Sequence, residues 1–306
     1  MDHAAYVREV MRSLVPLETG LVAKLPEMPG IRAVVFDIYG TLLISGAGEI
    51  CPAGTEWAGV VEGSHKDTKP RSEDGEVDAK ANFFAREQFG EKGDGFFRVY
   101  QETIFRYQEQ RRSFGVAFPE VDIREVWVDT LAALGLPPRE PAEIEDLSVR
   151  FECSVNPVWT MPGAAGVIEQ VRLSGLKMGI ISNAQFYTLP VMEGLFGTTL
   201  DGLGFDPSLQ VFSFQVREGK PSRRLFDDLA GKAGECGIEP GQIFYLGNDM
   251  SKDVLPARAT GFRTGLFAGD ATSLRLGEYS AAEAFSLADA VITDLAQIPR
   301  ILKISS

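Results

Sequence analysis

The sequence predicts an α/β protein with a doubly wound, mostly parallel, Rossmann-like sheet and an inserted α-helical domain. After Pro162, short apolar runs alternate with amphipathic segments. This alternation is typical of a parallel sheet whose strands are joined by right-handed crossovers. Before that point, between residues 76 and 153, apolar side chains recur at spacings of three and four, which indicates helices. With 306 residues, the chain is long enough for one or two domains.

The first half of the sequence predicts a short helix, one strand and then the helical insert. The helix covers residues 4–16 and the strand covers residues 32–37. A segment from Ser45 to Val77, rich in Gly, Ser, Lys and Glu, has little periodicity and predicts a long excursion. Three helical patterns follow, over residues 76–114, 122–135 and 141–153. Several aromatic and apolar positions are expected to form the core of this insert rather than a substrate box: Phe83, Phe84, Phe89, Phe96, Phe97, Tyr100, Ile104, Phe105 and Tyr107.

The second half of the sequence predicts the alternating helices and strands of the sheet. The pattern gives helix 164–174, strand 177–182, helix 188–196, strand 210–214, helix 221–236, strand 242–247, helix 251–260, strand 264–267, strand 290–293 and a final helix. Pro221 is expected in the first turn of its helix, where its missing N–H costs nothing.

The composition excludes some classes of partner. The formal net charge is −13, which disfavours binding to nucleic acid or to an anionic membrane surface. No apolar stretch approaches the roughly 18 residues of a membrane-spanning helix, and the first residues lack the layout of a signal peptide. We therefore expect a cytoplasmic protein whose partner is a small-molecule substrate, with a homodimer as the one protein assembly considered.

Cysteine and histidine contribute little to the predicted chemistry. Cys51, Cys153 and Cys236 are scattered and odd in number, which is typical of reduced thiols, and no pair has the spacing of metal ligands. The two histidines, His3 and His65, are far from the predicted strands in sequence. We therefore do not expect a nucleophile that is activated by histidine.

An apolar, β-branched run predicts a buried strand that ends at Asp37. Open α/β sheets bind ligands at the carboxyl ends of their strands, which is where this carboxylate is delivered. Gly40 then turns the backbone, and Thr41 supplies a hydroxyl group. An aspartate in this place can act as a covalent nucleophile, although one that merely caps a turn would look the same in the sequence.

Three later segments add polar groups to the ends of predicted elements. The strand at 177–182 ends in Ser182 and is followed by Asn183. Lys220 stands just before a predicted helix, and the strand at 242–247 is followed by Asp249 and Asp253. Each has an ordinary explanation on its own, because serine and aspartate cap helices and most lysines lie on surfaces.

Taken together and in this order, the four segments resemble the motifs of the haloacid dehalogenase (HAD) superfamily of hydrolases. They are Asp37-Ile-Tyr-Gly-Thr41, Ser182-Asn183, Gly219-Lys220-Pro221, and Gly247-Asn248-Asp249 with Asp253. The resemblance covers roughly residues 31–50 and 160–300. It implies a catalytic core of residues 32–48 and 158–306, a helical cap of residues 49–157 and an N-terminal helical extension of residues 1–31. Hinges between core and cap are expected near 45–52 and 155–162.

The resemblance implies a role for each motif residue. Asp37 would attack the substrate and form an aspartyl intermediate. Ser182 and the backbone N–H of Asn183 would hydrogen-bond the substrate, as would Thr41. Lys220 would pair with the nucleophile and with the negative charge that develops during reaction.

The family phosphatases also imply Mg²⁺ as a cofactor. Its ligands here would be Asp37, the backbone carbonyl of Tyr39, Asp249 and, as a further candidate, Asp253. Mg²⁺ favours hard oxygen ligands and retains several waters. Phosphoryl transfer depends mainly on positioning and electrostatic stabilisation, which such a set would supply.

Two departures from the family pattern affect the predicted reaction. Family phosphatases usually carry a second aspartate two residues after the nucleophile as general acid and base, and this position is Tyr39. Tyrosine is a poor proton shuttle at neutral pH, and its presence resembles the 2-haloacid dehalogenases, whose halide leaves without a proton. The fourth motif looks closer to the magnesium-type phosphatases, yet its usual first acid is Asn248. Tyr39 is retained as a candidate catalytic residue.

Three functions therefore follow from the sequence. We favour a Mg²⁺-dependent phosphatase acting on a small phosphate monoester. The first alternative is a metal-independent 2-haloacid dehalogenase, in which a cap arginine would hold the halide and carboxylate. The arginines available for this are Arg71, Arg86, Arg98, Arg106, Arg111 and Arg112. The second alternative is a catalytically silent member that binds a phosphorylated ligand or a protein partner.

Overall fold

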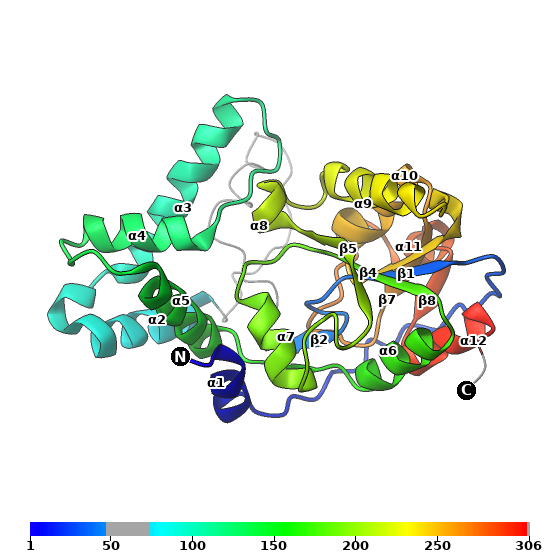
Figure 1. Ribbon diagram of the computed structural model, residues 1–306, viewed down its shortest axis with the longest axis horizontal. Coiled ribbons are helices and arrows are strands. Elements are labelled where there is room, and N and C mark those ends of the chain that lie inside the picture. The colour runs from blue at the N-terminus through cyan, green and yellow to red at the C-terminus, as the bar shows by residue number, and fades with distance from the viewer. Residues whose placement is uncertain (47–73, 305–306) are drawn as a thin grey trace.

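The computed structural model describes residues 1–46 and 74–304, and these fold around a six-stranded parallel sheet (Figure 1). The strand order is β5-β4-β1-β6-β7-β8. The strands are β1 Ala33–Phe36, β4 Lys177–Ser182, β5 Phe205–Phe212, β6 Ile243–Gly247, β7 Arg263–Phe267 and β8 Ala290–Ile292. The predicted α/β fold with a mostly parallel sheet is confirmed.

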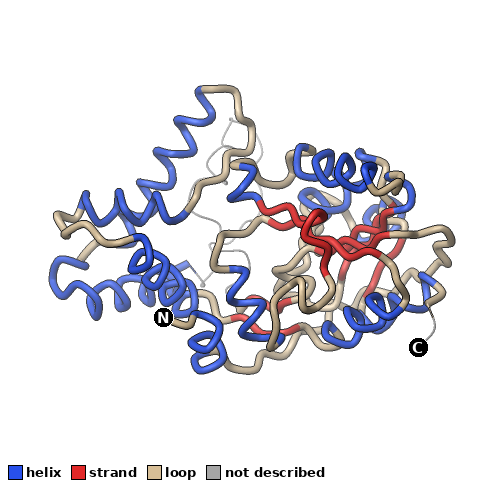
Figure 2. Tube along the Cα trace, in the orientation of Figure 1, coloured by secondary structure: helices blue, strands red, loops and turns tan. Residues whose placement is uncertain are grey.

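Helices cover both faces of the sheet because its central strand is apolar on both sides (Figure 2). Val34 and Phe36 of β1 belong to one hydrophobic cluster, whereas Ala33 and Val35 belong to another on the opposite face. The first cluster includes residues of α1 His3–Val10, α6 Ala164–Leu173, α7 Thr188–Phe196 and α12 Ile298–Leu302. The second cluster includes residues of α9 Arg224–Glu235 and α10 Leu255–Thr260. The short helix α8 Ser213–Val216 follows β5, and the short helix α11 Ala281–Leu287 precedes β8.

Four further helices form a separate layer, at the left of Figure 1. They are α2 Asp74–Phe89, α3 Phe96–Ser113, α4 Ile123–Ala133 and α5 Pro141–Val155. They have a hydrophobic cluster of their own, centred on aromatic rings: Phe96 lies 5.0 Å from Trp127 and 5.7 Å from Phe151, measured between ring centroids. We call these four helices the cap and the sheet with its flanking helices the core.

A two-stranded antiparallel ribbon lies where the chain passes between core and cap. It pairs β2 Leu43–Ser45 with β3 Val158–Thr160. Both strands lie next to the segments where hinges are expected, but their pairing is not evident from the sequence. The excursion that begins near Ser45 lies mostly outside the described residues, as do Cys51, His65 and Arg71.

Several element boundaries differ from the predicted ones, for local reasons. Helix α1 ends at Val10 rather than residue 16, because Met11 takes an extended conformation with φ −71° and ψ 148°. The helical pattern over 76–114 is divided by a turn in which Gly90 and Gly95 take φ angles of 62° and 75°, a region that glycine enters without strain. The strand predicted at 210–214 starts at Phe205 and gives way to α8.

Two further boundaries concern the segments that carry the motifs. The helix predicted from Pro221 begins at Arg224, after a turn in which the N–H of Ser222 donates to the carbonyl of Gly219 at 3.0 Å. The helix predicted at 251–260 begins with a π-helical turn, η4 Met250–Val254. Of the helices described, none is both long enough and apolar enough to cross a bilayer.

Candidate active site at the carboxyl edge of the sheet

Asp37 stands directly after β1 and is almost fully buried. Its N–H donates to the carbonyl of Leu246 at 2.9 Å, which extends the β1–β6 ladder by one residue. The chain then turns at Gly40, where φ is 81° and a Cβ atom would lie 2.6 Å from the Nδ2 atom of Asn248. Only glycine suits this turn, so the Gly40 position fixes the direction in which Asp37 is presented.

Lys220 joins two buried carboxylates. Its Nζ atom donates to Oδ1 of Asp37 at 2.8 Å and to Oδ1 of Asp253 at 2.6 Å. The Lys220 backbone is held by Asn183, whose Oδ1 atom accepts from the Lys220 N–H at 2.7 Å. The predicted pairing of Lys220 with Asp37 is therefore present in the structure.

Asp253 is positioned by three donors. Besides Lys220, the hydroxyl group of Tyr245 donates to its Oδ1 atom at 2.7 Å, and the N–H of Asp249 donates to its Oδ2 atom at 3.0 Å. Gly247 leaves the space for this carboxylate, because a Cβ atom at position 247 would lie 2.3 Å from the Cγ atom of Asp253. Both oxygens of Asp253 are thus engaged inside the protein, and its evident role is to hold Lys220.

Burial and neighbouring charges set the protonation of this group. Burial raises the pKa of Asp37 to about 6, and the negative charge of Asp253 adds to the effect, while Lys220 acts in the opposite direction. Burial alone would lower the pKa of Lys220, but Asp253 and Asp37 together raise it above its ordinary value. Lys220 therefore remains an ammonium group, and Asp37 is mostly ionised above a pH of about 6.

The other predicted substrate contacts are placed around Asp37 in different ways. Ser182 is buried, and its hydroxyl group lies close enough to Asp37 to lower the pKa of that carboxyl group. The Thr41 hydroxyl group points instead to Oδ1 of Asn248, at 3.4 Å. The side chain of Asn183 serves the Lys220 loop, as described above, and also lines the cavity beside Asp37.

Tyr39 is placed in the cavity wall rather than in a proton path. Its hydroxyl group lies 3.0 Å from the Thr188 hydroxyl group. Burial, with a contribution from the charge of Glu152, raises the pKa of Tyr39 above its ordinary value. Because ionisation is made harder, Tyr39 is unsuited to the acid and base role that family phosphatases assign to this position.

The predicted Mg²⁺ ligands do not form a matching donor set. Asp249 caps η4, with its Oδ1 atom accepting from the N–H groups of Ser251 and Lys252 at 2.7 and 2.8 Å. Asp253 is engaged by Lys220, and the Nδ2 atom of Asn248 donates to the carbonyl of Ser273 at 2.6 Å. Over residues 1–46 and 74–304, no three His, Cys, Asp or Glu side chains are grouped so as to hold a metal ion. Asp249 and Asp253 thus both accept hydrogen bonds from protein groups.

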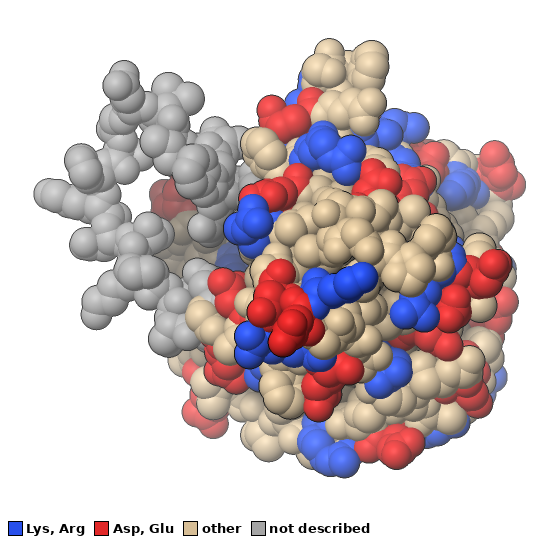
Figure 3. Space-filling view, turned by 90° about the vertical axis from the view of Figure 1, so that its left-hand side faces the viewer, with Lys and Arg blue, Asp and Glu red and all other residues tan. Residues whose placement is uncertain are grey.

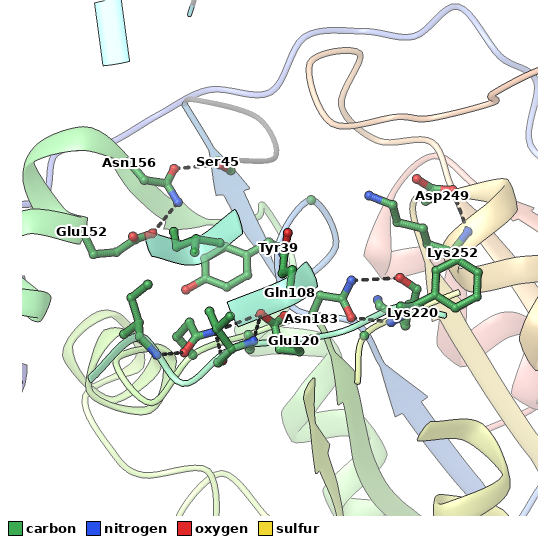
Figure 4. A pocket seen from close by; sticks show the side chains of 18 of the residues that line it. Tyr39, Ser45, Gln108, Glu120, Glu152, Asn156, Asn183, Lys220, Asp249 and Lys252 are labelled. Carbon is green, nitrogen blue, oxygen red and sulfur yellow. Dashed lines mark hydrogen bonds between the residues drawn. The ribbon is translucent and has the colours of Figure 1, made fainter. Parts of the chain in front are cut away.

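A cavity of about 430 Å³ lies between core and cap and opens onto Asp37. Residues of the core supply its polar end, including Lys220, Lys252 and Arg275. Residues of the cap supply aromatic and aliphatic walls and a few polar side chains: Phe97, Tyr100, Ile104, Gln108, Phe151 and Glu152. Figure 4 shows Lys220, Lys252 and Asp249 on one side of Tyr39, with Glu152 and Asn156 on the other.

The candidate cap arginines are placed mostly away from this cavity. Arg86, Arg98 and Arg106 are exposed and form ion pairs with Asp94, Glu102 and Asp129. Arg112 lines the cavity and pairs with Glu109 at 2.6 Å. Arg71 lies outside the described residues. Figure 3 shows that basic and acidic side chains are intermixed over the cap side of the surface.

Solved structures have a similar fold. The chain is similar to a 2-haloacid dehalogenase from Pseudomonas syringae pv. Tomato DC3000, with 18% identity, a TM-score of 0.54, and coverage of 89% of this chain and 97% of that one. It is also similar to a HAD phosphatase from Thermococcus onnurineus, with 18% identity, a TM-score of 0.50, and coverage of 90% and 99%. No family model and no curated protein matches the sequence. The chain therefore has the fold of the HAD hydrolases, as the motifs predicted.

Several residues of the site were not identified from the sequence, among them Tyr245, Glu152 and Gln108. Tyr245 lies in an otherwise apolar strand, and a buried tyrosine needs a partner for its hydroxyl group, which was the available signal. Glu152 lies on the buried face of α5, four residues after Ser148 and three before Val155. Gln108 had no such signal, since only the position of α3 over the cavity gives it a role.

Proposed function

We propose that this chain is a HAD-type hydrolase that cleaves a small phosphate monoester through an aspartyl-phosphate intermediate on Asp37. The observation that carries the proposal is the buried Asp37–Lys220–Asp253 group at the mouth of a cavity between core and cap. A carboxylate nucleophile with one cation beside it is the minimum that such a displacement requires.

The charge and size of the cavity favour a phosphate ester as substrate. Lys252 and Arg275 line the same cavity as Lys220, so three segments of the core contribute basic groups to its lining. The cavity volume of about 430 Å³ falls within the range of roughly 300–1,000 Å³ that is usual for sites binding metabolite-sized ligands. A three-carbon haloacid would leave much of it empty.

The geometry gives each residue a step. An oxygen of Asp37 attacks phosphorus, and the bond from phosphorus to the ester oxygen breaks. Lys220 offsets negative charge on the reacting groups, and Asp253 keeps the ammonium group in place. Water then hydrolyses the aspartyl phosphate, which releases inorganic phosphate and restores Asp37.

The leaving group receives no proton from Tyr39, since the pKa of that phenol is raised. An alkoxide leaving group must therefore take its proton from water or from the substrate itself. We expect faster turnover of aryl than of alkyl phosphates, because a phenolate leaves without protonation. Equal rates on the two would contradict this step.

One observation favours a second candidate, a 2-haloacid dehalogenase. A halide leaves without a proton, so the reaction does not need an acid at the position of Tyr39. Asp253 and Asp249 accept hydrogen bonds from protein groups, and this arrangement suits a reaction that needs no metal. In that reaction Asp37 would attack the halogen-bearing carbon, and water would hydrolyse the resulting ester.

The decisive experiment measures hydrolysis of para-nitrophenyl phosphate with Mg²⁺ and with EDTA, by the wild type and by Asp37→Asn. Activity that requires Asp37 supports the phosphatase, and the EDTA arm shows whether Mg²⁺ adds to the charge that the lysines supply. Halide release from 2-chloropropionate in EDTA, without phosphatase activity, would identify the dehalogenase. Thermal stabilisation by phosphate esters with neither activity would indicate a silent binding protein.

A further inference from the structure

Glu152 is a buried carboxyl group of the cap that faces the cavity without a cation to pair with. It is 8% exposed and belongs to α5. Its hydrogen bonds come from neutral groups: the Nδ2 atom of Asn156 donates at 2.9 Å, and the hydroxyl group of Tyr187 is also within reach. No described Lys, Arg or His forms an ion pair with it. Burial of a carboxylate is costly unless it is paired, so this group lacks its complement.

Aromatic rings surround the same end of the cavity. Tyr39, Tyr100 and Tyr187 all lie close enough to Glu152 for its charge to raise their pKa values. The ring of Phe151 lies 5.3 Å from that of Tyr100, measured between centroids, and both line the cavity. Aromatic faces attract cations, and walls of this kind recur where proteins bind ammonium groups.

A second polar side chain points to the same chemistry. Gln108 of α3 lines the cavity and is 3% exposed, yet its Oε1 atom has no hydrogen-bond partner among the described residues. A buried carbonyl oxygen without a donor is uncommon in proteins and costs free energy. A ligand that donates a hydrogen bond to the Oε1 atom would satisfy Gln108, which lines the same cavity as Glu152.

We propose that the cap end of the cavity binds a protonated amine, with Glu152 as its counter-ion, Gln108 as an acceptor and the surrounding rings as its walls. This inference rests on the proposed function when it is applied to the substrate, which then becomes a phosphate monoester bearing an ammonium group. The two ends of the cavity are complementary to such a molecule, since Lys220 and Lys252 lie on one side of Tyr39 and Glu152 lies on the other (Figure 4).

The first test compares two ligands that differ only in the amine. Isothermal titration calorimetry measures the binding of 3-aminopropyl phosphate and of propyl phosphate to Asp37→Asn, which blocks turnover. We expect the amine to bind about tenfold tighter or more, the effect of one charged hydrogen bond. Adding Glu152→Gln should reduce this preference to within about twofold. The matched control, Glu145→Gln, makes the same change on the same helix and should leave the preference intact.

A second variant keeps the test informative if Glu152→Gln does not fold. Gln108→Met removes the amide acceptor while keeping a side chain of similar length, and it should reduce the amine preference by a smaller factor than Glu152→Gln. Equal binding of the two phosphates by Asp37→Asn would overturn the inference, as would a preference that both variants retain.

A separate arm keeps this inference distinct from the phosphatase proposal. Binding of 3-phenylpropylamine and of 3-phenylpropanol to the wild type needs no phosphate and no turnover. If the amine binds more tightly through Glu152 while no phosphate ester is hydrolysed, the phosphatase proposal fails and the amine site stands. If both propyl phosphates are hydrolysed at the same rate and the two phenylpropyl compounds bind equally, the amine site fails and the phosphatase stands.

Discussion

The two ends of the cavity treat buried charge in opposite ways. At the core end, Asp37 and Asp253 share one ammonium group, and Tyr245 and a backbone N–H complete the network. At the cap end, Glu152 has only neutral partners among the described residues. The comparison suggests that the core end is prepared for a reaction, because its charges are fixed before a ligand arrives. The cap end is prepared for recognition, because its charge is completed by a ligand.

The largest expected effect comes from a substitution that disrupts the charged group at the core end of the cavity. Lys220→Met leaves Asp37 and Asp253 facing each other without a cation, so we expect a loss of about 3–5 kcal/mol in the free energy of unfolding at pH 8. Turnover should fall by about 10²–10³-fold or more. Denaturant unfolding and steady-state kinetics measure the two effects. The matched control is Lys177→Met, which removes an exposed pair with Asp206 and should cost about 0–1 kcal/mol.

The next effect tests whether the cap has a core of its own. Trp127→Ala empties the centre of the cap cluster, and such truncations cost about 3–5 kcal/mol. We expect an early unfolding transition of the cap in calorimetry, with the unfolding of the core little changed. Trp127→Phe keeps a ring in place and removes an indole N–H that has no partner in the described structure, so it should cost much less. A single transition that moves as a whole would show that cap and core unfold together.

A smaller expected effect is a shift in the pH dependence of kcat/KM, which reports on the charged group at the core end of the cavity. Asp37 must be ionised to attack, and its pKa is raised to about 6, so kcat/KM should fall as the pH drops through about 6. Asp253→Asn removes a charge that raises this pKa and should move the acid limb to lower pH. Asp206→Asn, at the surface, should leave the limb in place. Comparing variants also separates Asp37 from the second ionisation of a phosphate monoester, which lies near the same value.

The smallest effect concerns Tyr245 as a positioning residue. Tyr245→Phe removes the hydroxyl group that donates to Asp253 at 2.7 Å while Lys220 remains paired. We expect a loss of about 1–3 kcal/mol in stability and a decrease in kcat of about tenfold with little change in KM. Tyr279→Phe, outside the cavity, is the control. A change in KM alone would indicate that Tyr245 acts on substrate binding instead.

Much of the fold could be predicted because its signals are local. The strand at 177–182 and the helix at 188–196 have the bounds that the sequence indicated, since apolar periodicity is unbroken in both. The β2–β3 ribbon could not be predicted, because its strands are three residues long and lie more than a hundred residues apart. The end of α1 at Val10 could not be predicted, because Pro16 restricts only the residue directly before it.

The candidate site was predictable to a similar extent. Asp37, Lys220 and Asp253 were identified by their places after strands and before a helix, and the structure brings them together. The separate roles of Asp37 as nucleophile and of Asp253 as the partner that holds Lys220 could not be predicted, because they depend on which donors hydrogen-bond to each oxygen of Asp253. Glu152 and Gln108 acquire a role only when α3 and α5 are packed over the core, which is a property of tertiary structure.

The shared ammonium group has a consequence for how this protein can change over many generations. With two carboxylates depending on one lysine, a substitution of Lys220 strands both carboxylates, whereas loss of one carboxylate leaves the other paired with the lysine. Such coupled positions resist stepwise drift. The walls contributed by the cap lie outside this charged group, so new ligand preferences can arise there while the chemistry beneath stays fixed.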